Sequence, residues 1–303
     1  MKLRGFFAVL PLILVSATAL AQNNRSAVSI NGSDANNCQP SSPCRSFSYA
    51  ITQTNPTGEI IALDSGGYGG LTITKAITIE AAPGVYAGVT ATAGDAILIN
   101  AGSGDKVIIR GLTMNGMGTA SSAVAATLGA MEVYVENCII DGFANYGIIT
   151  FLSLRVQDTV IRNCGTGIWV DNAGGPVRAI IDHTQVKEIA GGGAYYPGTG
   201  ILCYRNAVVL VRNSIVTFAG TALLGSGGGQ LNVENCLVAN NTTGITSQET
   251  GTLVRVSNTL TTANATGWSN SMQSGFESYG NNRTRGNTTD IGGTGLIVTV
   301  PQS

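Results

Sequence analysis

A short pattern that recurs six times constrains this chain more than any other feature. It reads Val-Glu-Asn-Cys at 135–138 and at 233–236, and every copy begins with Val or Ile and ends with Cys, Thr or Ser. The third residues of the copies lie 21, 25, 30, 22 and 23 residues apart: Asn137, Asp158, His183, Asn213, Asn235 and Asn258. A repeat of that length, with short apolar alternations between Gly and Asn, is typical of a solenoid.

Each copy predicts two short strands that meet at a tight bend. Val133 and Val135 alternate with polar residues before the bend, and Cys138 and Ile140 do so after it. A residue at such a bend usually needs a positive φ, which Asn, Asp, His and Gly tolerate best. We therefore expect the third residues, here called the marker residues, to stack along one edge. Gly111 takes the marker place one coil earlier.

A third strand per coil is indicated by Gly or Ala followed by an apolar residue. This motif occurs at Gly147-Ile148, Gly167-Ile168, Gly200-Ile201, Ala222-Leu223 and Gly244-Ile245. Three short parallel strands per coil, with inward aliphatic side chains stacked on their equivalents, predict an all-β, right-handed parallel β-helix. Apolar runs upstream supply earlier coils, so we expect roughly eight to ten coils between residues 59 and 268.

The first 21 residues have the pattern of a cleavable secretory signal. Lys2 and Arg4 precede an apolar core, and Ala19-Leu20-Ala21 provides the small residues of a cleavage site. No other apolar run approaches the length of a membrane span. We therefore expect a secreted protein, periplasmic or extracellular, that does not insert into a membrane.

Both ends of a solenoid need covers, because an end exposes strand edges and apolar side chains. Residues 22–58 are expected to form an N-terminal cap. Within it, Ser42 and Pro43 predict the start of an amphipathic helix that includes Phe47, Ala50 and Ile51. Residues 269–303 lose the repeat and are interpreted as a C-terminal closing segment.

The cysteines predict one disulfide in this exported chain. Cys38 and Cys44 share a Pro-containing loop and are expected to pair. Cys138 and Cys236 occupy equivalent places four coils apart, which at ~4.8 Å per stacked strand separates them by about 19 Å, too far for a bond. We expect these two, and also Cys164 and Cys203, to be reduced.

Composition argues against several classes of partner. Only 11% of the residues are charged and the net charge is −1, so the basic face that nucleic acid requires is missing. No Gly-rich phosphate loop, nucleophile elbow or metal-binding Cys/His spacing occurs, so we expect no metal and no cofactor. We also expect a monomer.

These motifs together resemble the right-handed β-helix proteins of the pectin lyase-like superfamily, especially small secreted bacterial members of unassigned function. The resemblance covers about residues 36–300. It rests on Cys44-Arg45-Ser46-Phe47 with Ala50-Ile51, on Leu63-Asp64-Ser65-Gly66 with Tyr68-Gly69, and on the Val-x-Asn-Cys coils. It implies the fold but no single activity, because this fold hosts lyases, hydrolases, esterases, tail spikes and adhesins.

The usual catalytic carboxylates of that superfamily are missing from the sequence. Polygalacturonase-like members carry acids in the turn before the Gly-Ile strand, whereas the corresponding turns here hold none. A lyase site would need acids beside a base, and the nearest set is Asp141, Arg162 and Lys187 in successive coils. The alternative is a row of surface charges that offset one another. His183, the only histidine, is accounted for by its bend.

An aromatic surface on the Gly-Ile strands is the more promising site. The outward positions there include Ile149, Leu202 and Leu224, and a Gly-rich insertion nearby carries two tyrosines. A sugar could stack on the rings while polar groups orient its hydroxyls. The resemblance implies that this strand lines the substrate groove. The predicted glycan-binding residues are Phe151, Trp169, Asp171, Tyr195, Tyr196, Tyr204 and Arg205.

Three functions remain open from the sequence. The first is a secreted β-helix that binds polysaccharide or cell-surface glycan without the usual catalytic carboxylates. The second is a polysaccharide lyase-like enzyme with a nonstandard site, and the third is a structural rod or adhesin module. An open groove over Trp169 and Tyr204 would favour the first two, whereas the third would fit a surface covered by the insertion at 190–198 or by the Ala-rich stretch at 118–130.

Overall fold

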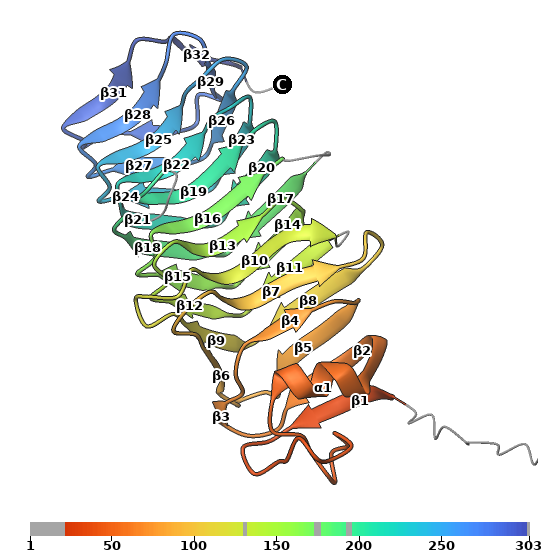
Figure 1. The fold of residues 1–303 in the computed structure, drawn as a ribbon. Coiled ribbons are helices and arrows are strands. Elements are labelled where there is room, and N and C mark those ends of the chain that lie inside the picture. Colours follow the sequence, from red (N-terminus) through yellow and green to blue (C-terminus); the bar gives the residue numbers. More distant parts are fainter. Residues whose placement is uncertain (1–21, 130–131, 173–176, 192–195, 302–303) are drawn as a thin grey trace, which may run out of the picture.

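Parallel strands stacked in three sheets make up most of the molecule. The structure, a computed structural model, describes residues 22–129, 132–172, 177–191 and 196–301 (Figure 1). In these residues the sheets hold 12, 10 and 10 strands, and each strand pairs in parallel with its equivalent in the next coil. The parallel β-helix of about ten coils that the repeat predicts is confirmed.

The three sheets are named here by their place relative to the marker residues. Sheet 1 precedes the marker and contains β1(Asn23–Val28), β2(Thr54–Ala62), β5(Ile77–Ala81), β8(Lys106–Arg110), β11(Glu132–Glu136), β14(Ser153–Gln157), β17(Arg178–Asp182), β20(Val208–Arg212), β23(Gln230–Glu234), β26(Leu253–Ser257), β29(Gly275–Ser278) and β32(Ile297–Thr299). Sheet 2 follows the marker and contains β3(Gly66–Gly67), β6(Ala87–Thr90), β9(Leu112–Asn115), β12(Ile139–Asp141), β15(Val160–Arg162), β18(Gln185–Ile189), β21(Ile215–Ala219), β24(Leu237–Ala239), β27(Leu260–Thr262) and β30(Arg283–Thr284).

Sheet 3 carries the Gly-apolar motif and the aromatic surface. Its strands are β4(Leu71–Ile73), β7(Asp95–Ala101), β10(Ser122–Gly129), β13(Tyr146–Thr150), β16(Thr166–Asp171), β19(Thr199–Tyr204), β22(Thr221–Gly225), β25(Thr243–Ser247), β28(Thr266–Asn270) and β31(Thr289–Gly293). The Ala-rich stretch at 118–130 does not cover this sheet, because residues 122–129 are one of its strands, β10.

All six marker residues, and Gly111, have the positive φ that the bend predicts. The values for the six lie between 45° and 51°, in the left-handed region that Asn and Gly occupy most easily. Along the edge, Asn235 Nδ2 donates to Asn213 Oδ1 at 2.7 Å and Asn258 Nδ2 donates to Asn235 Oδ1 at 3.1 Å. His183 takes its place in this row with a φ of 47°.

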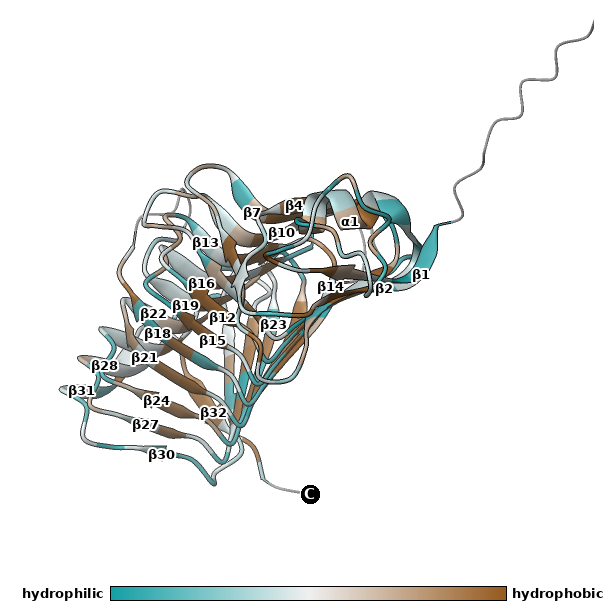
Figure 2. Cartoon of the chain, turned by 90° about the horizontal axis from the view of Figure 1, so that it is seen from below, coloured by the Kyte–Doolittle hydropathy of each residue, from teal (hydrophilic) through white to brown (hydrophobic). Residues whose placement is uncertain are grey.

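Stacked aliphatic residues fill the interior of the solenoid. Ile148, Ile168 and Ile201 occupy one register in sheet 3 and are fully buried. Hydrophobic stretches recur on the strands of successive coils (Figure 2). Cys138, Cys164, Cys203 and Cys236 are buried and unpaired, as expected. Burial raises the pKa of the Cys138 thiol to about 12, so it behaves as a small apolar residue.

The N-terminal end is closed by a disulfide loop and a short helix. Cys38 and Cys44 form the expected disulfide. The helix α1(Phe47–Gln53) buries Phe47, Ala50 and Ile51, but it starts four residues later than Ser42 and Pro43 predict. Ser46 is the N-cap, because its side chain accepts from the Tyr49 N–H at 3.2 Å. The Ser42–Pro43 pair lies in the disulfide loop.

The C-terminal segment continues the coils instead of closing them. The sequence loses its repeat after residue 268, yet β29, β30, β31 and β32 extend all three sheets in parallel register. The spacing survives without the motif because the strands pair through backbone groups, which any residue supplies.

Candidate functional site

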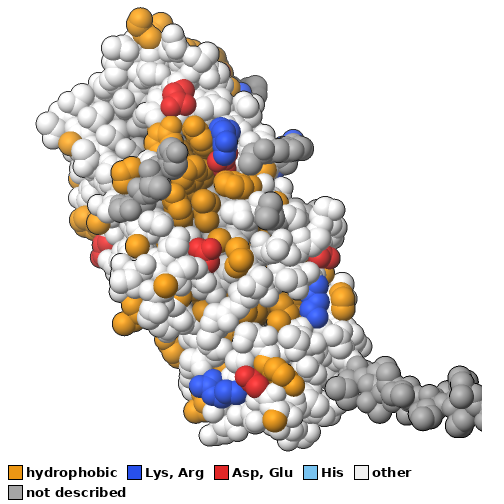
Figure 3. All heavy atoms as spheres, in the orientation of Figure 1, with side chains coloured by type: hydrophobic (Ala, Val, Ile, Leu, Met, Phe, Trp, Pro, Cys, Tyr) orange, Lys and Arg blue, Asp and Glu red, His pale blue; other side chains and the backbone are white. Residues whose placement is uncertain are grey.

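A cluster of apolar side chains lies on the outer face of sheet 3. Register places Ile149 beside Trp169, Trp169 beside Leu202, and Leu202 beside Leu224. Tyr146 completes the buried part of the cluster, and Tyr196 and Tyr204 pack against it. Figure 3 shows this hydrophobic patch over the middle strands of sheet 3.

Trp169 is a wall of the site and not an open platform. Its ring meets the Tyr146 ring edge-on at 5.3 Å between centroids and the Tyr204 ring at 6.1 Å. Only 6% of Trp169 is exposed. The neighbouring rings pack around it, so of the two alternatives left by the sequence the enclosed one describes Trp169 itself.

Tyr196 covers one side of the cluster, as the alternative interpretation predicts for the insertion. Its ring lies 5.6 Å from the Tyr204 ring. Its hydroxyl lies within hydrogen-bond distance of Ser226, at 3.2 Å, and of Glu249, at 3.1 Å. Burial raises the pKa of the Tyr196 hydroxyl. The neighbouring Tyr195 lies outside the described residues.

A hollow remains beside Trp169 on the other side of the cluster. Its volume is about 450 Å³. Apolar and aromatic side chains form most of its wall, and one ion pair lies at its edge: Tyr146, Ile149, Phe151, Trp169, Asp171, Tyr204 and Arg205. The structure thus brings five of the seven predicted glycan-binding residues together, and places Tyr196 against the same cluster.

The ion pair is formed by a buried carboxylate and an exposed guanidinium. Asp171 ends β16 and is fully buried, whereas 48% of the Arg205 side chain is exposed. Arg205 Nε donates to one Asp171 oxygen at 2.6 Å and Nη2 donates to the other. This hydrogen bonding raises the pKa of Arg205. The guanidinium also lies 5.4 Å from the centre of the Tyr204 ring, so its position is fixed from two sides.

A turn of unusual backbone geometry gives Arg205 this position. Arg205 and Asn206 have φ values of 45° and 60°, so the chain turns sharply as soon as β19 ends. Since Asp171 pairs in register with Tyr204, the turn brings the next residue, Arg205, over the carboxylate.

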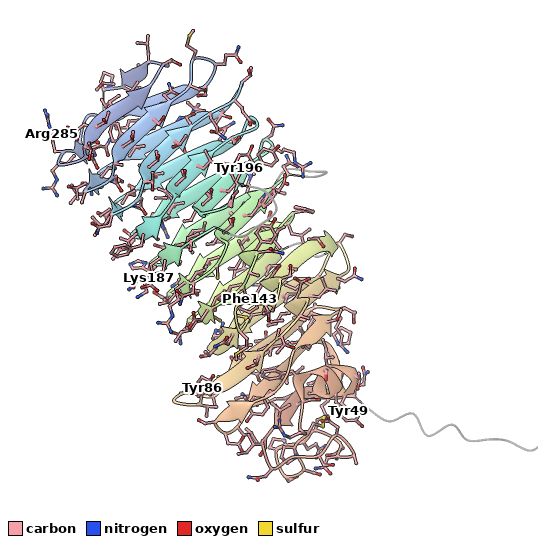
Figure 4. The ribbon with its side chains drawn as sticks, turned by 60° about the vertical axis from the view of Figure 1, so that its left-hand side comes forward. Tyr49, Tyr86, Phe143, Lys187, Tyr196 and Arg285 are labelled. Atoms are coloured by element: carbon pink, nitrogen blue, oxygen red, sulfur yellow. A yellow bond between two sulfur atoms is a disulfide. The ribbon has the colours of Figure 1, made fainter. Side chains whose placement is uncertain are left out.

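The candidate lyase residues lie on a different sheet. Asp141, Arg162 and Lys187 occupy one register of sheet 2, as the sequence predicts. Figure 4 labels Lys187. Arg162 Nη2 lies 3.1 Å from an Asp141 oxygen, and Asn163 donates to the other oxygen at 2.7 Å. The carboxylate is thus engaged by its neighbours. Within the described residues, no group of three or more potential ligands could hold a metal ion.

His183 is exposed at its bend and belongs to a surface cluster. Its Nδ1 lies 2.8 Å from an Asp182 oxygen. The same carboxylate accepts from Arg212 at 2.9 Å and from Asn213 at 2.8 Å. Among the described residues, Asp182 is the carboxylate that forms an ion pair with His183, and none of the residues that line the hollow belongs to this cluster.

Sequence reasoning missed one residue of the site and one buried row of amides outside it. Tyr146 lines the hollow at a position where six later coils have Thr, and that exception was the available signal. In the turns searched for catalytic acids, Asn241 and Asn264 form a buried amide row. Asn241 Nδ2 donates to Asn264 Oδ1 at 2.9 Å, and Asn264 Nδ2 donates to Asn287 Oδ1 at 2.9 Å. Their spacing of 23 residues was visible in the sequence.

Comparison with known proteins identifies the fold. Neither a protein-family model nor a curated protein matches the chain. Among solved structures, XylC in complex with xylose has a TM-score of 0.63 at 10% identity, and the match covers 91% of this chain and 70% of that one. An alginate lyase from Paenibacillus sp. str. FPU-7 has a TM-score of 0.52 at 15% identity, covering 90% and 99%.

A third similar structure, a rhamnogalacturonan lyase, has a TM-score of 0.53 at 11% identity, covering 90% of this chain and 84% of that one. Sequence identities this low to solved structures establish the architecture alone.

No helix among the described residues is long and apolar enough to cross a membrane. The chain is a parallel β-helix of the pectin lyase-like fold.

Proposed function

We propose that this is an exported glycan-binding protein and that the hollow beside Trp169 holds part of a saccharide chain. The observation that carries the proposal is the combination of aromatic walls with a fixed guanidinium in one hollow of about 450 Å³. Pyranose rings present apolar C–H faces and a rim of hydroxyls, and this site offers a counterpart to each.

Aromatic edges and aliphatic side chains would contact the apolar part of the sugar. Phe151 and Tyr204 are half-buried wall residues, so each keeps surface that a ligand can cover. Arg205 would supply the polar contact. Asp171 accepts two of the five N–H donors of a guanidinium, which leaves donors for sugar hydroxyls.

The charge balance of the hollow favours a neutral sugar over a uronate. Asp171 and Arg205 are the two charged residues that line it, and their charges offset each other. A uronate carboxylate would therefore meet a guanidinium that is already neutralised. We expect binding to neutral oligosaccharides that is nearly insensitive to salt, because screening weakens only interactions between net charges.

The wider context supports an exported carbohydrate-associated role. The similar structures include an alginate lyase, a rhamnogalacturonan lyase and a xylose complex. The Cys38–Cys44 disulfide fits an oxidising compartment. The expected secretory signal at 1–21 lies outside the described residues and supports the same proposal.

A structural rod is the second candidate, and Tyr196 is the observation that favours it. The Tyr196 ring already covers part of the aromatic cluster, so the cluster stabilises the solenoid whether or not a ligand binds. Ligand binding distinguishes the two functions, since a rod needs Arg205 only to neutralise the buried Asp171 carboxylate, whereas a glycan-binding protein also uses the remaining N–H donors of Arg205.

Binding to a glycan array, followed by titration of the best ligand, tests the proposal. Tyr204→Leu should weaken binding by about tenfold or more, because it removes the ring that faces both the hollow and Arg205. Tyr134→Leu is the matched control, since Tyr134 is a half-buried tyrosine that packs beside Lys106 on sheet 1. Absence of any glycan ligand, or equal losses in the two variants, would favour the rod.

A further inference from the structure

One inward-facing row of sheet 3 becomes exposed at the C-terminal end. Its members Ile201, Leu223 and Ile245 are fully buried, and Trp268 in the next coil is 4% exposed. Ile291 pairs in register with Trp268, yet it is 55% exposed. Since Ile291 continues an interior row, its exposure shows that the described residues leave the core open at this end.

The last strand of each sheet at this end also has an edge that pairs with no described strand. The strands β30, β31 and β32 are each the last of their sheet, so each presents an edge of N–H and C=O groups beyond which no described strand lies (Figure 2). Leu296 is 84% exposed beside these edges, and Ile297, which pairs in register with the buried Phe276, is the partly buried inward residue of β32. An apolar cross-section framed by strand edges is a surface on which another coil could stack.

The opposite end cannot supply that coil. At the N-terminus, α1 lies against β1, β2 and β4 and buries Phe47, Ala50 and Ile51. The loop closed by Cys38 and Cys44 lies beside it. Two copies therefore cannot stack end to end in the same direction, because the helix and the loop occupy the place where the strands would pair. If two copies stack at their ends, the C-terminal end of one copy must therefore meet the C-terminal end of the other.

We propose that the C-terminal end of the solenoid is an interface whose partner is the same end of a second copy of this chain. A two-fold axis would place β32 antiparallel to its copy and bury Ile291, Leu296 and the part of Ile297 that is still exposed. The charges allow this contact. Arg285 is largely exposed and lies 3.7 Å from Asp290, so a facing copy can set Arg285 opposite Asp290 (Figure 4).

This dimer differs from the monomer that the sequence predicts, and it is independent of the sugar site, which lies on the side of the solenoid. Sedimentation equilibrium of the full mature chain over a hundredfold range of concentration tests it. The wild type should show a reversible monomer–dimer equilibrium. Ile291→Arg should raise the dissociation constant by about tenfold or more, because a charge would be buried without a partner.

Ile139→Arg is the matched control, because Ile139 is 41% exposed on the outer side of sheet 2, away from both ends. It should leave the equilibrium unchanged. If Ile291→Arg loses its far-ultraviolet circular dichroism, Leu296→Glu decides, since a side chain 84% exposed contributes little to the fold. A monomeric wild type, end-to-end fibres, or a control as disruptive as the Ile291 variant would overturn the proposal.

Discussion

At the scale of single residues, the marker bends explain why Asn recurs at a fixed place in the coil. Asn235 combines a φ of 50° with amide contacts to Asn213 and Asn258. An Asn side chain tolerates the left-handed conformation, and its amide can donate to one neighbour and accept from the other. Backbone geometry selects the residue type, and stacking adds the hydrogen bonds.

Asn235→Ala should lower the free energy of unfolding by about 1–2 kcal/mol, because it adds left-handed strain and removes two amide contacts. Asn235→Gly should cost less, since glycine relieves the strain but not the lost contacts. Urea denaturation measures both. Asn232→Ala, at a residue inside strand β23, is the control and should change stability little. Equal costs for the Ala and Gly variants would refute the conformational explanation.

The ion pair of the hollow shows where residue-level prediction succeeded and where it stopped. The outward alternation placed Asp171 on the aromatic surface, Arg205 was predicted to flank that surface, and the structure brings the two together. The alternation could not show that Asp171 is fully buried, because burial depends on the turn at Arg205 and Asn206, and positive φ at those residues has no repeating signal.

At the scale of elements, periodicity predicted the strands and bends of the coils well. It predicted the two ends of the solenoid poorly. The start of α1 was misplaced because Ser42-Pro43 and Ser46-Phe47 both resemble a helix start, and only the packing of Phe47 selects the second. The final coils were missed because β30 and β31 lack aliphatic alternation. The sequence also could not show that Trp169 is enclosed, since Tyr146 and Tyr204 reach it from neighbouring strands.

The aromatic cluster of sheet 3 should behave as a second small core. Trp169→Ala should lower the free energy of unfolding by about 3 kcal/mol, because it leaves a cavity among Tyr146, Tyr204 and Leu202. Tyr134→Ala on sheet 1 should cost about 1 kcal/mol, since that ring is half-exposed. Thermal or urea unfolding compares the two. A Trp169 variant as stable as the wild type would show that the cluster is an open surface after all.

At the scale of the whole molecule, carboxylates held in ion pairs and hydrogen bonds should make the free energy of unfolding depend on pH in the acidic range. Burial acts to raise the pKa of Asp182, but hydrogen bonds from Asn213 and Arg212 outweigh it, and the pKa is lowered. A lowered folded pKa means that the unfolded chain takes up protons first. The stabilisation is therefore complete above about pH 4 and is lost as the pH falls through the lower folded value.

Asp182→Asn should consequently reduce the loss of stability between about pH 7 and about pH 3, because it removes one carboxylate whose protonation is linked to unfolding. Urea denaturation at the two pH values measures the slope. Asp105→Asn is the control, since Asp105 lies in an exposed turn before β8. An unchanged slope in the Asp182 variant would show that this cluster does not contribute to acid stability.

The proposal that the hollow of sheet 3 binds a glycan is tested most directly by the fluorescence of Trp169. The chain has two tryptophans, so Trp268→Phe leaves Trp169 as the single reporter. Trp169 lines the hollow, so an oligosaccharide selected on the array should shift its emission saturably, with the same dissociation constant as direct titration. A ligand that binds without any change in Trp169 emission would place the binding surface elsewhere and contradict the account.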